Sequence, residues 1–235
     1  MIVDLLVEYK QLIIQGFLTT IKLSLIGIAL STVWGFVIGF FRNSRNDFLR
    51  VFGYYYVELF RNIPLIVQIF FIYFSFNIVD VFPVLKDLAK VLNVDDPNAF
   101  FSALIALVLY TSAYISEVVR SGLNAIPYSQ IEAAMSLGLT RLQIIRYVII
   151  PELFLVIIPA LTNQYLNLIK NSSLAMTIGV AELTFVTQQI DAETFRGFEA
   201  ATIVTILYIV LTLTTSFIMN LVNRWVSKNG RRVFA

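Results

Sequence analysis

A polar stretch divides the sequence near its middle and separates long apolar segments: Pro127-Tyr-Ser-Gln-Ile-Glu-Ala-Ala-Met-Ser-Leu-Gly-Leu-Thr-Arg-Leu-Gln-Ile-Ile-Arg146. Ser129 and Glu132 have the spacing of a capping box, in which each side chain satisfies a free backbone donor at a helix start. Gly138 stands where a left-handed residue would end that helix without a Cβ penalty. The first half of the stretch therefore predicts a short helix closed by a glycine turn.

The second half of the stretch predicts a second helix. Thr140 and Gln143 repeat the capping-box spacing, and the residues that follow continue without a break to Pro151. Residues 127–146 are therefore predicted to form a helical hairpin on the water side of a membrane. A well-formed hairpin with no further role fits these capping signals as well.

The composition is that of an integral membrane protein. The chain has 235 residues, of which 58% are hydrophobic and 14% charged, and its mean hydropathy of +0.81 is far too apolar for a soluble domain of this size. The length suits a single membrane domain over residues 1–235. Cysteine and histidine are absent, which excludes disulfides, thiolate nucleophiles, bis-histidine haem and ordinary zinc sites. No Walker A sequence occurs, so ATP would have to bind another subunit.

Five segments are long enough to cross a hydrocarbon core, which requires about 20 helical residues. We expect an all-α fold with five membrane helices and the N-terminus outside. The expected spans are residues 17–41, 51–76, 99–119, 148–169 and 198–225. The second span should break at Pro64, and residues 178–190 should hold a short external helix.

Charged residues set the expected orientation, because arginine and lysine accumulate in cytoplasmic loops. The loop 41–50, the central loop 127–146 and the C-terminal tail are basic, whereas the alternate loops 77–98 and 171–197 carry acidic residues as well. This distribution places the central loop and the C-terminus in the cytoplasm.

Charged residues at the ends of the spans suggest local pairs. Glu58 and Arg61 are three residues apart and can pair on one helix face, and Glu117 and Arg120 repeat that spacing. Lys22 fits a snorkelling anchor near the outer end of the first span.

Four motifs, in order along the chain, resemble the permease subunits of bacterial ATP-binding-cassette importers, in particular the polar amino-acid branch. Glu132-Ala-Ala, Gly138 and Ile149-Ile-Pro151 resemble the EAA loop, which contains the coupling helix of that family. The segments 56–68, 111–120 and 162–174 resemble three more family signatures. The resemblance covers most of the chain from about Thr19 onward. It implies contact with an ATPase for Glu132, Ala133, Ala134, Ser136, Leu137, Gly138 and Arg141.

The resemblance also implies a fold, partners and a location. The fold would be that of a type I importer permease in the bacterial inner membrane, surrounded by lipid. A dimer of ATP-binding-cassette ATPases would bind ATP and magnesium, so no cofactor is expected in this chain. The other implied partners are a second permease, identical or paralogous, and an external substrate-binding protein. We expect no nucleic-acid partner, no metal site and no catalytic residue.

Polar side chains inside the fourth span point to a substrate cavity or to a partner helix. Asn163, Asn167 and Lys170 share one helix face by their i, i+4, i+7 spacing, and Gln164 lies beside them. Twelve residues separate Pro151 from Asn163, about 18 Å of helix, which places these amides near the middle of the membrane. They could bind an amino acid or form hydrogen bonds across a dimer seam. Gln68, after the Pro64 break, is a weaker candidate for the same cavity.

The fourth span favours an acidic or amide substrate, since residues 153–169 contain no carboxylate and Lys170 adds positive charge. A cationic side chain bound away from water would need a close anionic partner. The sequence therefore predicts an ATP-driven importer of glutamate, aspartate or glutamine that works by alternating access. An ion-gradient-driven transporter or channel without an ATPase is the alternative, and a cofactor-bearing membrane enzyme is disfavoured by the absence of histidine and cysteine.

Overall fold

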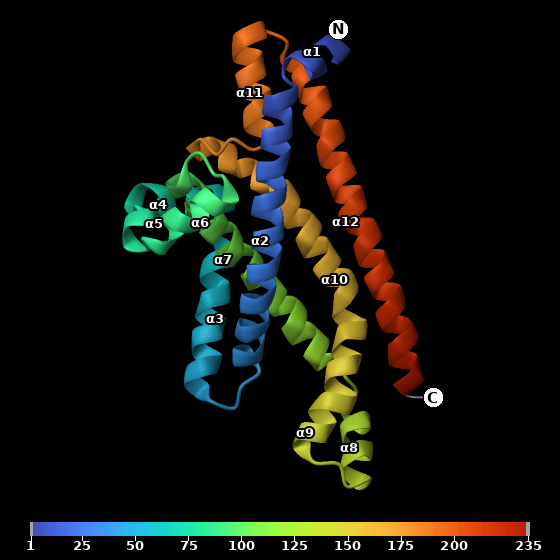
Figure 1. Ribbon diagram of the computed structural model, residues 1–235. Helices are drawn as coiled ribbons and strands as arrows, with labels where there is room; N and C mark the ends of the chain where they lie inside the picture. The colour runs from blue at the N-terminus through green and yellow to red at the C-terminus, as the bar shows by residue number, and fades with distance from the viewer. Residues whose placement is uncertain (1, 234–235) are drawn as a thin grey trace.

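The computed structural model describes residues 2–233, which form helices and connecting turns without any strand (Figure 1). The all-helical expectation is confirmed. The helices are α1 (Ile2–Glu8), α2 (Lys10–Arg42), α3 (Asp47–Asn62), α4 (Leu65–Ser75), α5 (Ile78–Val81), α6 (Val84–Leu92), α7 (Pro97–Asn124), α8 (Tyr128–Ser136), α9 (Arg141–Ile144), a π-helix (Ile145–Ile149), α10 (Ile150–Asn171), a 3-10 helix (Ser172–Ile178), α11 (Leu183–Thr194) and α12 (Gly197–Val233).

Four continuous helical stretches in the described residues are long and apolar enough to cross a membrane. They are α2, α7, the run Arg141–Ile178 and Gly197–Lys228 of α12, and they contain the first, third, fourth and fifth predicted spans. The helices are longer than those spans. α2 begins at Lys10 rather than near residue 17, because the polar residues that precede the apolar core remain helical outside it.

The second predicted span consists of two helices. α3 and α4 meet at 101°, with a break of a few residues around Pro64. Proline removes a backbone donor and disfavours helical geometry in the residue before it, and Ile63 is indeed extended. The side-chain nitrogen of Gln68, Nε2, donates to the carbonyl oxygens of Phe60, at 2.8 Å, and Ile63, at 2.9 Å. This side chain therefore satisfies carbonyls that the break leaves without helical partners.

α2 and α7 form the centre of the bundle because small residues allow their backbones to approach closely. Gly27, Ser31, Gly35 and Gly39 recur every fourth residue along α2 and lie on one face. A Cβ at Gly35 would stand 2.6 Å from Ile115, and one at Gly39 would stand 2.8 Å from Val119. These glycines are required by the packing of two helices and not by a turn.

The hairpin after α7 continues directly into the membrane helix. The second helix, predicted to run on to Pro151, continues beyond it, since α9, the π-helix and α10 form one unbroken run. Pro151 lies inside this run, two residues after the π-helix ends at Ile149, and its missing backbone donor does not interrupt the helix. Any movement of the hairpin is therefore applied directly to α10.

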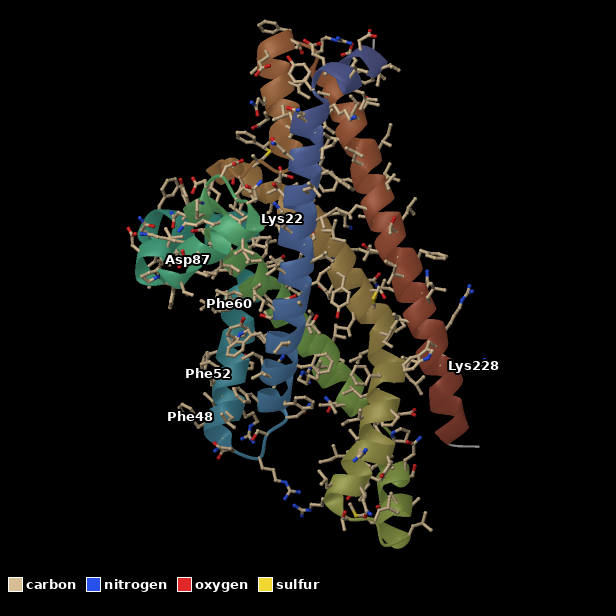
Figure 2. All side chains as sticks on the ribbon, in the orientation of Figure 1. Lys22, Phe48, Phe52, Phe60, Asp87 and Lys228 are labelled. Carbon is tan, nitrogen blue, oxygen red and sulfur yellow. The ribbon has the colours of Figure 1, made fainter. Side chains whose placement is uncertain are left out.

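The two ends of the bundle differ in content. Figure 1 shows the α2–α3 connection, the α8–α9 hairpin and the C-terminal part of α12 toward the lower end, and α1 and α11 at the upper end. α11 confirms the expected short helix after the fourth span. Between these ends, Lys22 of α2 donates through Nζ to the carbonyl oxygen of Asn93, at 3.3 Å, and so ties α2 to the end of α6 (Figure 2).

Candidate functional site

The α8–α9 hairpin is closed by Gly138. Its φ of +79° is left-handed, and no atom lies within 4 Å of where its Cβ would be, so backbone conformation alone favours glycine here. The amide of Gly138 donates to the Met135 carbonyl at 2.9 Å, and the amide of Leu139 donates to the Ala134 carbonyl at 3.2 Å. These two bonds are the pair that defines a Schellman motif. The glycine turn predicted from the sequence is confirmed.

One of the two predicted capping boxes is present. Thr140 accepts from the Gln143 amide at 3.4 Å, and the Gln143 side chain accepts from the Thr140 amide at 2.8 Å. The capping box predicted at Ser129 and Glu132 is wrong. α8 begins two residues earlier than that box would place it, directly after Pro127, whose side chain offers no cap, and Ser129 lies inside its first turn.

The outer surface of the hairpin is unusually apolar for a segment outside the bundle. Four of its large apolar side chains are more than half exposed: Tyr128 (65%), Met135 (51%), Leu137 (80%) and Leu142 (75%). The polar residues Glu132, Ser136 and Arg141 and the small Ala133 are exposed among them. An exposed apolar patch with a polar rim marks a protein interaction surface. The hairpin projects beyond the rest of the bundle (Figure 1), so this surface is accessible to a partner.

The inner surface of the hairpin is anchored to the membrane helix. Ala134 of α8 is buried against Ile144 of α9 and Val148 of the π-helix, with Ile131 and Leu139 at the edge of the cluster. α8 thus packs on the segment that leads into α10. A force applied to the exposed side of α8 would reach α10 through this apolar contact.

The predicted polar face of α10 lies on its surface. Asn163, Asn167 and Lys170 are exposed and Gln164 is half-buried. Within the described part of the chain, none of the four side chains has a hydrogen bond or an ion pair with another residue. Unpaired amides on the surface of a membrane helix have to face water or a partner rather than lipid.

The side chain of Lys170 lines a hollow that the sequence did not indicate. This α10–α12 hollow has a volume of about 360 Å³ and lies where α10, the 3-10 helix, α11 and α12 meet. Its lining contains five hydroxyl groups and one ammonium group. The lining residues are Lys170, Ser173, Thr184, Thr187, Ala201, Val204, Thr205 and Tyr208.

A buried carboxylate stands behind the α10–α12 hollow. Glu182 is fully buried; it caps α11 by accepting from the Phe185 amide at 2.9 Å and accepts from the Tyr208 hydroxyl at 2.6 Å. Burial raises the pKa of the Glu182 carboxyl above its ordinary 4.5, while hydrogen bonds from Thr184, Tyr208 and Phe185 oppose the rise. Glu182 therefore fixes the position of Tyr208 in the wall of the hollow.

Gln68 has a structural contact that the prediction did not foresee. It is buried on α4, and its amide nitrogen is occupied by the carbonyls at the α3–α4 break. Its side-chain oxygen is buried without a hydrogen-bond partner among the described residues. The suggestion that Gln68 contributes to the substrate cavity stays a prediction.

The charged residues of the second and third spans form one cluster centred on Glu117. Arg42 is ion-paired with it, Arg120 donates to it at 3.0 Å, and Arg61 lies 3.6 Å from it. The predicted Glu117–Arg120 pair is confirmed. The predicted Glu58–Arg61 pair is wrong, because Arg61 turns toward α7 and stacks on Tyr114, while Glu58 accepts from Asn62.

Sequence reasoning missed the hydroxyl groups of α11 and α12. The last span carries no charge from Ala200 to Asn223, so charge patterning gives no sign of a polar face there. The available signal was the spacing of Ala201, Thr205 and Tyr208, which puts small and polar groups on one helix face. The contribution of α11 had no local signal, since it depends on how the chain returns after the 3-10 helix.

Comparisons with known proteins agree with this architecture. Residues 13–228 match the family described as binding-protein-dependent transport system inner membrane component. The glutamate/aspartate import permease protein GltJ of Escherichia coli (strain K12) is 35% identical, over 94% of this chain and 90% of that protein. The glutamine transport system permease protein GlnP of the same strain is also 35% identical, over 91% of this chain and 92% of its own length.

Solved structures show the same fold. An amino acid ABC transporter crystallised with histidines has a TM-score of 0.77 and 33% identity and covers 93% of this chain and 96% of its own. The MetNI methionine ABC transporter, in an inward-facing conformation, has a TM-score of 0.73 at 22% identity, which shows the fold alone. The chain thus belongs to the family of binding-protein-dependent transport system inner membrane components, as a multi-pass permease of an amino-acid ABC importer.

Proposed function

We propose that this chain moves acidic or amide amino acids, namely glutamate, aspartate or glutamine, into the cytoplasm by ATP-driven alternating access. The observation that carries the substrate class is the polar face of α10. Asn163, Asn167 and Lys170 are exposed on this face, and residues 153–169 contain no carboxylate. Amides bind either a carboxylate or a carboxamide, and Lys170 adds an attraction for negative charge.

The α8–α9 hairpin would deliver the energy of ATP hydrolysis. Its exposed apolar patch is the docking surface for an ATPase on a separate chain, which binds ATP and magnesium. Glu132 and Arg141 at the rim would fix the register of docking. Because the hairpin packs on the run that becomes α10, closure of the ATPases would move the helix that carries the polar face.

A second permease and an external binding protein complete the proposed assembly. The exposed apolar faces of α3 and α12 provide area for lipid or for a second permease, as the aromatic residues Phe48 and Phe52 along α3 illustrate (Figure 2). The relatives that carry glutamate, aspartate or glutamine support the substrate class. An external binding protein would share in the selection of the substrate.

Uptake by the reconstituted complex tests this proposal. The chain should co-purify with an ATPase, and vesicles holding the complex and its binding protein should take up glutamate or glutamine when ATP is present. Arginine offered at the same concentration should be taken up at least about tenfold more slowly, since an unpaired buried charge costs several kcal/mol. Rapid arginine uptake with no glutamate uptake would contradict the substrate class. Uptake driven by an ion gradient without any ATPase would contradict the mechanism.

A further inference from the structure

We propose that the α10–α12 hollow binds the zwitterionic head group of the transported α-amino acid. The inference rests on the proposed function and deepens it, because it identifies a site where the charged ends of the substrate are held apart from its side chain. The hollow, about 360 Å³, lies within the roughly 300–1,000 Å³ range of small-molecule sites.

The positive end of the hollow suits a carboxylate. Lys170 is exposed into it, and among the described residues no acid pairs with its ammonium group. The hydroxyls of Thr187 and Thr205 are also free of hydrogen bonds in the described part of the chain and can donate. An α-carboxylate placed here would receive one charged and up to two neutral hydrogen bonds.

Two other hydroxyl groups of the lining, those of Ser173 and Tyr208, suit an ammonium group. The Ser173 hydroxyl donates to the Lys170 carbonyl at 2.7 Å, and the Tyr208 hydroxyl donates to Glu182 at 2.6 Å. A hydroxyl has one proton and two lone pairs. With their protons engaged elsewhere, Ser173 and Tyr208 present only lone pairs to the hollow. Glu182, which accepts the proton of the Tyr208 hydroxyl, adds negative potential next to that group.

The charge count matches a zwitterion and not a simple ion. The hollow has one cation in its wall and one carboxylate behind it, so a ligand with a positive and a negative end leaves neither unmatched. An inorganic anion would satisfy Lys170 alone. An α-amino acid carries both charges on one carbon, which is the separation that a single hollow can span.

The side chain would then follow α10. Asn167 lies three residues before Lys170 on the same face, about 4.5 Å along the helix, and Asn163 lies a further turn away. The carboxylate of glutamate and the carboxamide of glutamine can both bond to an asparagine amide. Because the hollow would bind only the head group and the asparagine amides would bind the side chain, glutamate and glutamine should bind with nearly equal affinity.

Direct binding to the permease–ATPase complex tests the assignment. The complex is placed in lipid nanodiscs without the external binding protein, and binding of radiolabelled glutamate is measured by scintillation proximity. Glutamine should compete within a few-fold of glutamate. N-acetylglutamate, which lacks the ammonium group, and the α-amide of glutamate, which lacks the α-carboxylate, should each compete about tenfold or more weakly, as expected for a lost charged hydrogen bond.

Variants separate the site from general damage. Lys170→Met should weaken glutamate binding about tenfold or more and should remove the preference for glutamate over its α-amide. Thr187→Val and Thr205→Val, which keep the side-chain shape, should weaken binding by smaller factors. Lys90→Met is the matched control, since Lys90 is an exposed lysine of α6 paired with Asp87 and stands outside the hollow; it should leave binding unchanged.

Two results would overturn the assignment. One is a Lys170→Met complex that binds glutamate within twofold of the unaltered complex. The other is a Lys170→Met complex that still distinguishes glutamate from its α-amide. ATP-driven import with the binding protein present is measured in parallel on the unaltered complex. If the unaltered complex imports glutamate and either result is found, the binding site is excluded but the proposed function stands. If the unaltered complex imports no amino acid at all, the proposed function itself is wrong.

Discussion

Glu117 connects three helices through a single side chain. Arg42 ends α2, Arg61 nears the end of α3, and Arg120 belongs to α7 with Glu117. Three guanidinium groups face one carboxylate, so the cluster carries a net positive charge. Charges inside a membrane bundle are costly unless they are paired. The Glu117 carboxylate therefore offsets the mutual repulsion of the three arginines and allows them to lie close together.

Glu117→Gln is expected to destabilise the folded protein. The substitution keeps the shape and one acceptor but leaves three arginines without a counter-charge. We expect a loss of roughly 2 kcal/mol, below the about 3–5 kcal/mol of a fully buried pair, because the Glu117 side chain is 21% exposed. Thermal unfolding of the protein in detergent measures the loss. Glu58→Gln, at an exposed site bonded to Asn62, is the control and should change stability little.

A double substitution checks the cause of that loss. If unpaired positive charge is responsible, adding Arg120→Gln to Glu117→Gln should restore part of the stability, so that the two effects are less than additive. Strict additivity would show that Glu117 and Arg120 do not act through each other.

Among the individual elements, the sequence predicted the α8–α9 hairpin and its glycine turn correctly but placed the N-terminal cap of α8 wrongly. Gly138 and the Thr140–Gln143 box are local features, and both are present. Ser129 and Glu132 have the correct spacing, yet α8 starts directly after Pro127, so Ser129 falls two residues too late to cap it. A capping pattern fixes the start of a helix only where no neighbouring residue imposes a start of its own, and the fixed φ of a proline does so.

The hairpin also carries the prediction on coupling. Gly138→Val should strain the left-handed turn by about 1–2 kcal/mol, while a Cβ at this position would meet no atom within 4 Å. We expect an inserted complex whose amino-acid uptake is lost or no longer linked to ATP hydrolysis. Glu132→Lys, which reverses an exposed charge at the rim of the apolar patch, should have the same effect.

Gly138→Asn is the matched control for the turn, since asparagine tolerates the left-handed conformation better than valine. It should retain more uptake than Gly138→Val. Uptake and ATP hydrolysis are measured on the same vesicles. Normal uptake with normal stimulation of hydrolysis in both Gly138→Val and Glu132→Lys would exclude the hairpin from coupling.

For the whole molecule, the lengths of the apolar segments predicted the membrane helices well but predicted poorly which helices contact each other. Each long apolar segment became a helix because a membrane leaves the backbone no other way to satisfy its hydrogen bonds. The α10–α12 hollow could not be predicted, because Lys170, Thr187 and Tyr208 come from three elements whose relative placement no local pattern encodes. The polar face of α10 was predictable, since its spacing alone puts Asn163 and Asn167 on one side.

The direction of packing adds an argument on topology that the sequence lacked. Gly35 of α2 faces Ile115 of α7, and Gly39, four residues later, faces Val119, also four residues later. α2 and α7 therefore run parallel. Two parallel spans can be joined only by a segment that crosses the membrane in the opposite direction, so α3 and α4 together have to make that crossing despite the 101° bend between them.

Reporter fusions test the resulting five-crossing topology with the N-terminus outside. A reporter active only in the cytoplasm should work when fused after Arg45, Arg141 or Lys228, because the α2–α3 connection, the α8–α9 hairpin and the end of α12 lie toward one end of the bundle (Figures 1 and 2). It should be silent after Asp191 in α11 and after Asp87 in α6, because α7 needs its N-terminal end on the side opposite the hairpin. Asp87 is the decisive fusion. A strong cytoplasmic signal there would mean that α3 and α4 enter the membrane and return to the same side, and the parallel packing of α2 and α7 would then be incompatible with a cytoplasmic hairpin.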